Sequence, residues 1–216
     1  VTKPNIWVAA GTYKPSYAYD LTDDFYYYHF RMVEGCKIYG GFAGNESSSG
    51  ERENFGEGEA NETILSGDIN DEGFLYDNCF HVFYHPAGLG LTNEAVLDGF
   101  IIKHGNGIPG SNQKGGGIYN NQNSPLIRNC VITDNITDLG AGVYNYYSSP
   151  LLINCIIKNN EGEDYGGGIM NYGESTPVLK NCLIQGNYSS YGGGIYNYQV
   201  SESTLINCTI VDNSSG

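Results

Sequence analysis

The sequence has few basic residues and no long apolar segment, and each shortage excludes a class of protein. Its 216 residues include 10 Lys and Arg against 24 Asp and Glu, which gives a formal net charge of −14. A surface with this charge repels nucleic acid and anionic membranes, so neither is expected as a partner. No stretch is apolar for long enough to cross a bilayer, so we do not expect this chain to insert into a membrane.

Helix-forming sequence is also scarce. Runs of Ala, Leu, Glu and Lys are missing and charged residues make up only 16% of the chain, whereas there are 31 Gly and 19 Tyr. This composition disfavours helices and favours short strands joined by tight turns. No signal peptide precedes the first strand-like segment, NIWVAAGTY, so we expect a mature chain or a fragment.

A glycine-rich phrase occurs four times in the second half of the chain. It reads KGGGIYNNQ at 114–122, LGAGVYNYY at 139–147, YGGGIMNYG at 165–173 and YGGGIYNYQ at 191–199. A phosphate-binding loop would need one such phrase leading into a helix, whereas each copy here leads into a strand-like segment. The phrase belongs to a repeat with a period of 25–27 residues, which is also the spacing of Cys130, Cys155, Cys182 and Cys208.

Each repeat contains three short strand-like pieces separated by Gly, Asn, Asp and Pro. No piece can bury an apolar face alone, but coils stacked about 4.8 Å apart can bury one together. The repeat therefore predicts an all-β protein, a single-stranded right-handed parallel β-helix with three short strands per coil. We expect one domain over residues 1–216, with irregular first coils and long loops over 1–90 and regular coils over 91–216.

Two polar excursions, residues 15–35 and 43–62, interrupt the predicted first coils. Loops on a rigid scaffold often carry binding specificity. They can equally shield the open edge of a first coil, which would otherwise pair with other chains. The sequence leaves both roles open.

Alignment of the repeats assigns columns of side chains to the interior. Three apolar columns are predicted: Ile127, Leu152, Leu179, Leu205; Ile132, Ile157, Ile184, Ile210; and Ile118, Val143, Ile169, Ile195. Two asparagine columns are predicted at bends, where stacked amides satisfy turn carbonyls: Asn129, Asn154, Asn181, Asn207; and Asn120, Asn145, Asn171, Asn197. The cysteine column is predicted to be buried and reduced, because a coil spacing of about 4.8 Å exceeds the Cβ separation that a disulfide needs.

The phrases GGGIYN and NCxIxxN resemble the repeats of polymorphic outer membrane proteins, which pair a GGA[I/V/L] phrase with an F-x-x-N phrase. Here ITDN, IKNN, IQGN and IVDN stand in place of F-x-x-N, with Ile instead of Phe. The segments IWVAAGTYKP, IYGGFAGNE and TILSGDI resemble the opening coils of pectin-lyase-like β-helix proteins that bacteria secrete. The resemblance implies an extracellular or cell-surface location on a bacterium or archaeon. It leaves the activity open, because such helices include adhesins, fibre modules and carbohydrate-active enzymes.

The candidate binding residues are tyrosines that follow the glycine phrase at outward positions. One predicted ladder contains Tyr119, Tyr144 and Tyr196, with Met170 in the same column, and a second contains Tyr146, Tyr172 and Tyr198. Stacked rings stabilise a sheet by about 0.5–1.5 kcal/mol per pair, and they also form a flat platform on which sugar rings can lie. Ladder stability and glycan binding therefore both remain as interpretations.

A calcium ion is the candidate cofactor. The segment DINDEG places Asp68, Asn70 and Glu72 before Gly73, which matches the first half of a calcium loop. The twelfth position of such a loop is Cys79 rather than Glu, so the motif is incomplete.

No catalytic set stands out in the repeats. A β-helix hydrolase needs clustered carboxylates, and no repeat column pairs Asp or Glu with His. His104, His81 and His85 are each more typical of turn or packing residues. We therefore predict a non-catalytic scaffold or adhesion module whose partners are glycans or a cell surface. A carbohydrate-active enzyme and a subunit of an end-to-end fibre, which would make self-association the partnership, are the alternatives.

Overall fold

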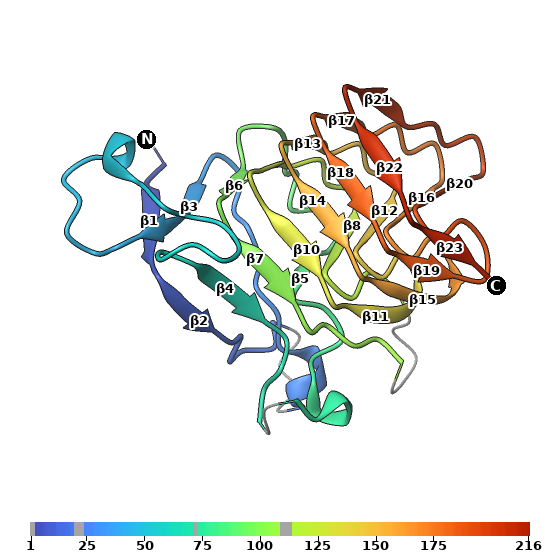
Figure 1. Ribbon diagram of the computed structural model, residues 1–216, viewed down its shortest axis with the longest axis horizontal. Helices are drawn as coiled ribbons and strands as arrows, with labels where there is room; N and C mark the ends of the chain where they lie inside the picture. The colour runs from blue at the N-terminus through green and yellow to red at the C-terminus, as the bar shows by residue number, and fades with distance from the viewer. Residues whose placement is uncertain (1–2, 20–23, 71–72, 109–113) are drawn as a thin grey trace.

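The computed structural model describes residues 3–19, 24–70, 73–108 and 114–216, and it shows a solenoid of short strands stacked along one axis (Figure 1). Pairing between successive coils is parallel in every sheet. The strands far outnumber the three short 3₁₀ helices, η1 (Phe25–Tyr27), η2 (Ser49–Glu51) and η3 (Leu75–Asp77). The predicted fold class, an all-β single-stranded parallel β-helix, is confirmed.

Two seven-stranded sheets run along most of the solenoid. Sheet A contains β1 (Asn5–Ala9), β3 (Lys37–Phe42), β6 (Val96–Asp98), β9 (Leu126–Arg128), β13 (Leu151–Ile153), β17 (Val178–Lys180) and β21 (Thr204–Ile206). Sheet B contains β2 (Gly11–Tyr13), β4 (Thr63–Ser66), β7 (Ile101–Lys103), β10 (Val131–Thr133), β14 (Ile156–Lys158), β18 (Leu183–Gln185) and β22 (Thr209–Val211).

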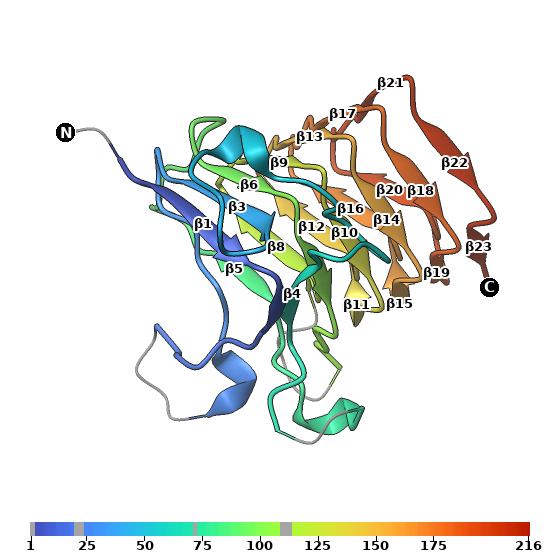
Figure 2. The same ribbon diagram turned by 60° about the vertical axis from the view of Figure 1, so that its left-hand side comes forward.

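Two shorter sheets complete each regular coil. Sheet C contains β5 (Phe83–His85), β8 (Ile118–Asn121), β12 (Val143–Tyr146), β16 (Ile169–Tyr172) and β20 (Ile195–Tyr198). Sheet D contains β11 (Ile136–Leu139), β15 (Glu161–Tyr165), β19 (Tyr188–Ser189) and β23 (Ser214–Ser215). Figure 2 shows the successive coils lying side by side.

Sheet D is the difference from the predicted three strands per coil. Its segments are polar and lack a repeated apolar alternation, so the pattern that marks the other strands is missing here. Backbone bonds between coils hold them instead, such as Glu161 N–H to Asn135 C=O at 2.9 Å and Tyr188 N–H to Asn160 C=O at 3.0 Å. The regular coil therefore has four short strands.

The predicted inward columns form the core. Ile127, Leu152 and Leu179 are fully buried, as are Ile132, Ile157, Ile184, Ile118, Val143 and Ile169. Leu205 is 43% exposed and Ile210 is 48% exposed, because they lie in the coil at the C-terminal end of the described residues. Burial of one such side chain contributes about 1.5–3 kcal/mol, so the columns are the main source of stability.

Three asparagine ladders connect the coils. At the bend between sheets A and B, Asn154 Nδ2 donates to Asn129 Oδ1 over 3.1 Å, and Asn129 and Asn154 have φ of 51° and 54°. The second predicted column does not lie at a bend: it is buried within the strands of sheet C, with Asn120, Asn145 and Asn171 each donating to the next coil. A third ladder, which was not predicted, runs beside sheet D through Asn135, Asn160, Asn187 and Asn213.

The glycine phrase is explained by close contact between coils. Its first glycine, such as Gly140, has a φ of 63°, a conformation that favours glycine. At the third position a Cβ on Gly117 would lie 2.5 Å from the carbonyl oxygen of Gly142, and the same holds for Gly142 against Gly168. A side chain there would push neighbouring coils apart.

The cysteine column is buried and reduced as predicted. The six cysteines are free, and Cys36, Cys79, Cys130, Cys155 and Cys182 are buried while Cys208 is half-buried. Burial raises the pKa of Cys130 to about 12, so its thiol is protonated at neutral pH.

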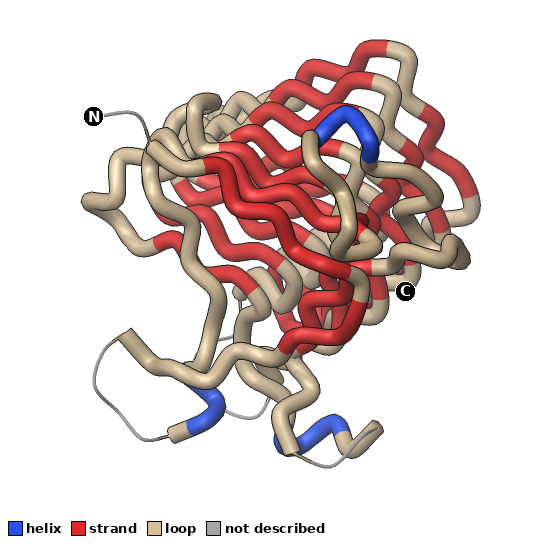
Figure 3. The backbone as a smooth tube through the Cα atoms, turned by 90° about the vertical axis from the view of Figure 1, so that its left-hand side faces the viewer, coloured by secondary structure: helices blue, strands red, loops and turns tan. Residues whose placement is uncertain are grey.

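The excursions of the first coils lie outside the stacked strands (Figure 3). In the first, Tyr26 stacks on Phe80 at 5.2 Å and its hydroxyl donates to the Tyr76 carbonyl, so η1 and η3 are joined. In the second, Phe55 packs on Gly41, and Glu57 pairs with Lys158 on β14 at 2.6 Å. The 43–62 excursion thus packs back onto the solenoid. The predicted boundary between irregular coils over residues 1–90 and regular coils over residues 91–216 stays a prediction.

Candidate functional site

A groove lined mainly by tyrosines runs along the outer side of sheet C, and its volume is about 410 Å³. We call it the tyrosine groove. Three columns of side chains, each following the axis, form it together with Lys114. They are Leu139 and Tyr165; Tyr144, Met170 and Tyr196; and Tyr146, Tyr172 and Tyr198.

The predicted ladder of Tyr146, Tyr172 and Tyr198 forms one wall of the groove. The ring centroids of Tyr146 and Tyr172 lie 5.4 Å apart at an interplanar angle of 27°, and those of Tyr172 and Tyr198 lie 5.5 Å apart at 40°. Strand register places these residues directly opposite one another on β12, β16 and β20. Tyr146 and Tyr172 are half-buried, and Tyr198 is 46% exposed.

The column of Tyr144, Met170 and Tyr196 forms the floor. Tyr144 was predicted to be an open platform, but it is only 2% exposed. It is covered because its ring lies between Tyr119 at 5.2 Å and Tyr146 at 6.4 Å. Burial raises the pKa of Tyr144, so its hydroxyl stays neutral.

Tyr119, also predicted as a binding residue, does not line the groove. Its ring stacks on Tyr84 at 5.0 Å and meets His81 edge to face at 5.5 Å. Burial raises the pKa of Tyr119 as well. Tyr119 therefore joins the regular ladder to the irregular first coils.

The opposite wall was missed by the sequence analysis. Tyr165 stacks on Tyr191 at 5.1 Å and lies 4.9 Å from Tyr196. A signal was present, since Leu139, Tyr165 and Tyr191 each stand directly before the first glycine of a repeat phrase. Without Leu139 and Tyr165, the tyrosines of sheet C would form a flat surface rather than a groove.

A group of carboxylates lies beside this wall. Asp138, which precedes Leu139, is 8% exposed, and its Oδ1 is buried without a hydrogen-bond partner. Burial, and after it the negative charges of Glu163 and Asp164, raise the pKa of Asp138 to about 6. The repeat alignment did not bring these residues together, because β11 and β15 pair with an irregularity between Thr137 and Leu139.

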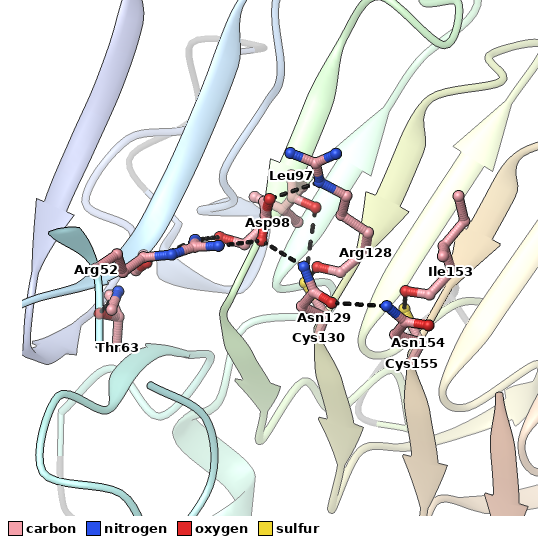
Figure 4. A network of polar contacts seen from close by, with 12 residues as sticks. Arg52, Thr63, Leu97, Asp98, Arg128, Asn129, Cys130, Ile153, Asn154 and Cys155 are labelled. Carbon is pink, nitrogen blue, oxygen red and sulfur yellow. Dashed lines mark hydrogen bonds and ion pairs between the residues drawn. The ribbon is translucent and has the colours of Figure 1, made fainter. Parts of the chain in front are cut away.

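A second polar centre joins the 43–62 excursion to sheet A. Asp98 is 1% exposed and accepts hydrogen bonds from Arg52 Nη2 at 2.9 Å, Asn129 Nδ2 at 2.9 Å and Arg128 Nε at 2.5 Å (Figure 4). The guanidinium of Arg52 also lies 3.9 Å from the centre of the Phe55 ring. Asp98 therefore ends the first asparagine ladder and fixes the excursion at the same point.

The predicted calcium residues lie in different surroundings. Asp68 is buried, its Oδ2 accepts the Gly73 N–H at 2.9 Å, and its Oδ1 lies 3.5 Å from the Lys14 ammonium. Asn70 is exposed, and Glu72 lies outside the described residues. Among residues that the structure describes, no three His, Cys, Asp or Glu side chains are close enough together to hold a metal ion. Asp68 Oδ1 makes no hydrogen bond and Glu72 lies outside the described residues, so calcium binding stays a prediction.

The histidines are packing residues. His81 and His85 are both buried, and burial lowers the pKa of each to about 4. His85 Nδ1 pairs with Asn120 Oδ1 at 2.8 Å. His104 has a φ of 65° in a turn, and burial lowers its pKa too.

The stacked parallel coils, with a groove on one outer face, define the class of protein as a β-helix. A family model described as "Right handed beta helix region" matches residues 70–216, which is more than half of the chain, so the chain belongs to this family. Neither the curated proteins nor the solved structures contain a match to the chain. Among the described residues, no helix combines the length and apolar character needed to cross a membrane.

Proposed function

We propose that this protein is a non-catalytic β-helix module, located outside the cell or on the surface of a bacterium or archaeon, that binds a glycan in the tyrosine groove. The observation that carries the proposal is the ladder of Tyr146, Tyr172 and Tyr198, which shares the groove with Tyr165 on the opposite wall. Tyrosine rings offer flat apolar faces beside hydroxyl groups, a combination that suits sugar rings. The extracellular location rests on the resemblance of the repeats to those of exported proteins.

The charge of the protein limits which kinds of glycan can bind in the groove. With a net charge of −14 and carboxylates beside one wall, strongly anionic polymers should be bound poorly in the groove. A neutral or weakly charged oligosaccharide is therefore the ligand we propose. Since coils repeat along the axis, the sugar chain would lie along the axis, with successive rings against successive coils.

The test is a glycan array, with calcium and with a chelator, followed by titration of the oligosaccharides retained. The variant Tyr146→Ala/Tyr172→Ala/Tyr198→Ala should lose retention, because each stacked ring contributes about 1 kcal/mol. The matched control is Tyr76→Ala, which removes a tyrosine that is 65% exposed on η3. If the triple variant retains the oligosaccharides as well as the wild type does, the ladder has a purely structural role. A requirement for calcium would support the predicted cofactor.

A glycoside hydrolase is a second candidate, and the carboxylates beside the groove favour it. A carboxyl group with a pKa near 6 is suited to act as a general acid, and Glu163 and Asp164 lie close enough to raise that pKa. Release of reducing ends by the wild type, lost in Asp138→Asn, would support the hydrolase. Binding without cleavage in both proteins would support the non-catalytic module.

A further inference from the structure

The strands of sheet A carry more basic than acidic residues, although the protein as a whole has a net charge of −14. These strands carry Lys37, Arg128 and Lys180, and the only acidic residue on them is Asp98, whose side chain is 1% exposed and paired. Apolar side chains alternate with these cations along the sheet surface. This face belongs to sheet A, whereas the tyrosine groove belongs to sheet C.

Arg128 is held in one orientation. Its Nε donates to Asp98 Oδ2, while Asp98 Oδ1 is occupied by Arg52 and Asn129. Because the bond to Asp98 uses Nε, both terminal nitrogens of Arg128 point away from the carboxylate (Figure 4). The side chain is 38% exposed. A guanidinium fixed in this way presents a pair of N–H donors that matches the two oxygens of a carboxylate.

Lys180 lies in the same outward column as Arg128. Strand register places Arg128 opposite Ile153, and Ile153 opposite Lys180. The two cations are therefore two coils apart, which corresponds to about 10 Å. Lys180 is exposed and Ile153 is half-buried.

The neighbouring outward column is aliphatic. It contains Leu126, Leu151 and Val178, which are opposite one another on β9, β13 and β17 and are half-buried. Sugar rings pack against aromatic faces, as in the tyrosine groove, whereas aliphatic side chains beside cations complement a polypeptide with apolar and acidic residues. The two faces thus fit ligands of different chemistry.

We propose that the outward face of β9, β13 and β17 binds an acidic polypeptide segment, with the fixed Arg128 and Lys180 each pairing with a carboxylate and the aliphatic column covered by apolar side chains of the partner. This interaction is independent of glycan binding by the tyrosine groove. Its affinity should fall as salt is added, because both cations are exposed to solvent.

The experiment uses a fluorescent peptide of alternating Glu and Leu and a matched peptide of alternating Lys and Leu, titrated with the full chain at low and at high salt. The wild type should bind the acidic peptide and not the basic one. The variant Arg128→Gln/Lys180→Gln should weaken binding by about tenfold or more, since two charge-assisted contacts are lost. The control Lys103→Gln/Lys158→Gln makes the same change in net charge on sheet B and should alter binding by less than about twofold.

Arg128→Gln also disturbs Asp98, so Lys180→Glu is measured separately, since it changes an exposed side chain outside that network. It should weaken binding while leaving the thermal midpoint of unfolding unchanged. Equal loss of binding in both double variants would overturn the proposal, because net charge alone would then explain it. Failure of the wild type to bind the acidic peptide at low salt would also overturn it. So would sedimentation showing that this face joins two copies of the protein and excludes the peptide.

Discussion

From residue 114 onward each coil repeats the contacts of the coil before it, whereas before residue 108 the coils are held by contacts that occur once. In the regular coils the same three apolar columns, three asparagine ladders and one cysteine column recur. In the first coils the connections are individual, such as Arg52 with Asp98, His85 with Asn120 and the stacked rings of Trp7 and Phe42.

In the repeat, many equivalent contacts each contribute a small part of the free energy of unfolding. In the irregular coils, a few single contacts each contribute a larger part. A contact in the regular coils is one of several equivalent contacts, so loss of one leaves neighbours in place. A contact in the first coils has no equivalent. Substitutions of similar chemistry in the two regions should therefore have different effects, apart from those that introduce a charge into the shared core.

The largest effect should come from Ile157→Asp. Ile157 is fully buried in the middle of an apolar column, so an unpaired carboxylate there should cost more than about 4 kcal/mol of unfolding free energy. Its counterpart Ile210→Asp lies in the same column but is 48% exposed, and should cost less than about 1 kcal/mol. Urea unfolding of the two variants measures the difference. Equal costs would mean that the inward register is wrong.

The next effect should come from Asp98→Ala, which breaks a contact of the first coils. It leaves the buried guanidinium of Arg52 without its carboxylate, and should cost about 3 kcal/mol. Asn154→Ala, which removes one member of a ladder, should cost about 1 kcal/mol. Thermal unfolding of both proteins tests the ranking. If Asn154→Ala lowers the stability as much as Asp98→Ala does, the idea that each repeated contact contributes less than a single contact is wrong.

A third effect concerns pH and again belongs to the first coils. The pKa values of His81 and His85 in the folded protein are about 4, below the value of about 6.5 in an unfolded chain. The unfolded state therefore binds more protons, and the stability contributed by both residues is present above pH 6.5 and lost as pH falls toward 4. We expect a loss on the order of 2 kcal/mol per histidine, measured as urea unfolding at pH 7 and pH 4.5.

Variants separate the histidines from the carboxylates in this measurement. His81→Gln/His85→Gln should flatten the loss of stability at acid pH. Asp138 acts in the opposite sense, because its raised pKa gives a contribution that is present at low pH and lost as pH rises through about 6. Asp138→Asn should therefore steepen the acid loss slightly. An unchanged pH profile in the histidine double variant would show that those residues are not buried in neutral form.

The fold was predictable because the repeat places the same residue type at the same depth in every coil. Period-2 alternation marked the strands of sheets A, B and C, and the spacing of Cys130, Cys155 and Cys182 marked the coil length. Sheet D was not predicted, since backbone bonding rather than apolar alternation defines it. Leu139 and Tyr165 are the last residues of two sheet D strands, so their positions could not be predicted either.

One wall of the tyrosine groove was predictable from the sequence and the other was not, because the second wall depends on sheet D. Outward tyrosines on sheet C follow from strand register, but the second wall depends on the direction in which the chain leaves sheet D. Asp138 meets Glu163 and Asp164 through an irregular pairing that no column shows. The connection between Arg52 and Asp98 spans 46 residues, and a pattern of local repeats carries no information about it.

The asparagine ladders also have a direction. In sheets C and D each amide donates toward the C-terminal coil, whereas at the bend between sheets A and B each donates toward the N-terminal coil and the last donation goes to Asp98. Asn145, Asn154 and Asn160 each give one such bond and receive one, so a whole coil could be duplicated or removed in the middle of the stack without leaving a donor or acceptor unmatched. The groups on which the ladders begin, Asp98, His85 and the Gly105 N–H, occur once each and are the fixed points. The number of coils, and with it the length of the tyrosine groove, can therefore change by recombination between repeats while the chemistry at the ends stays the same.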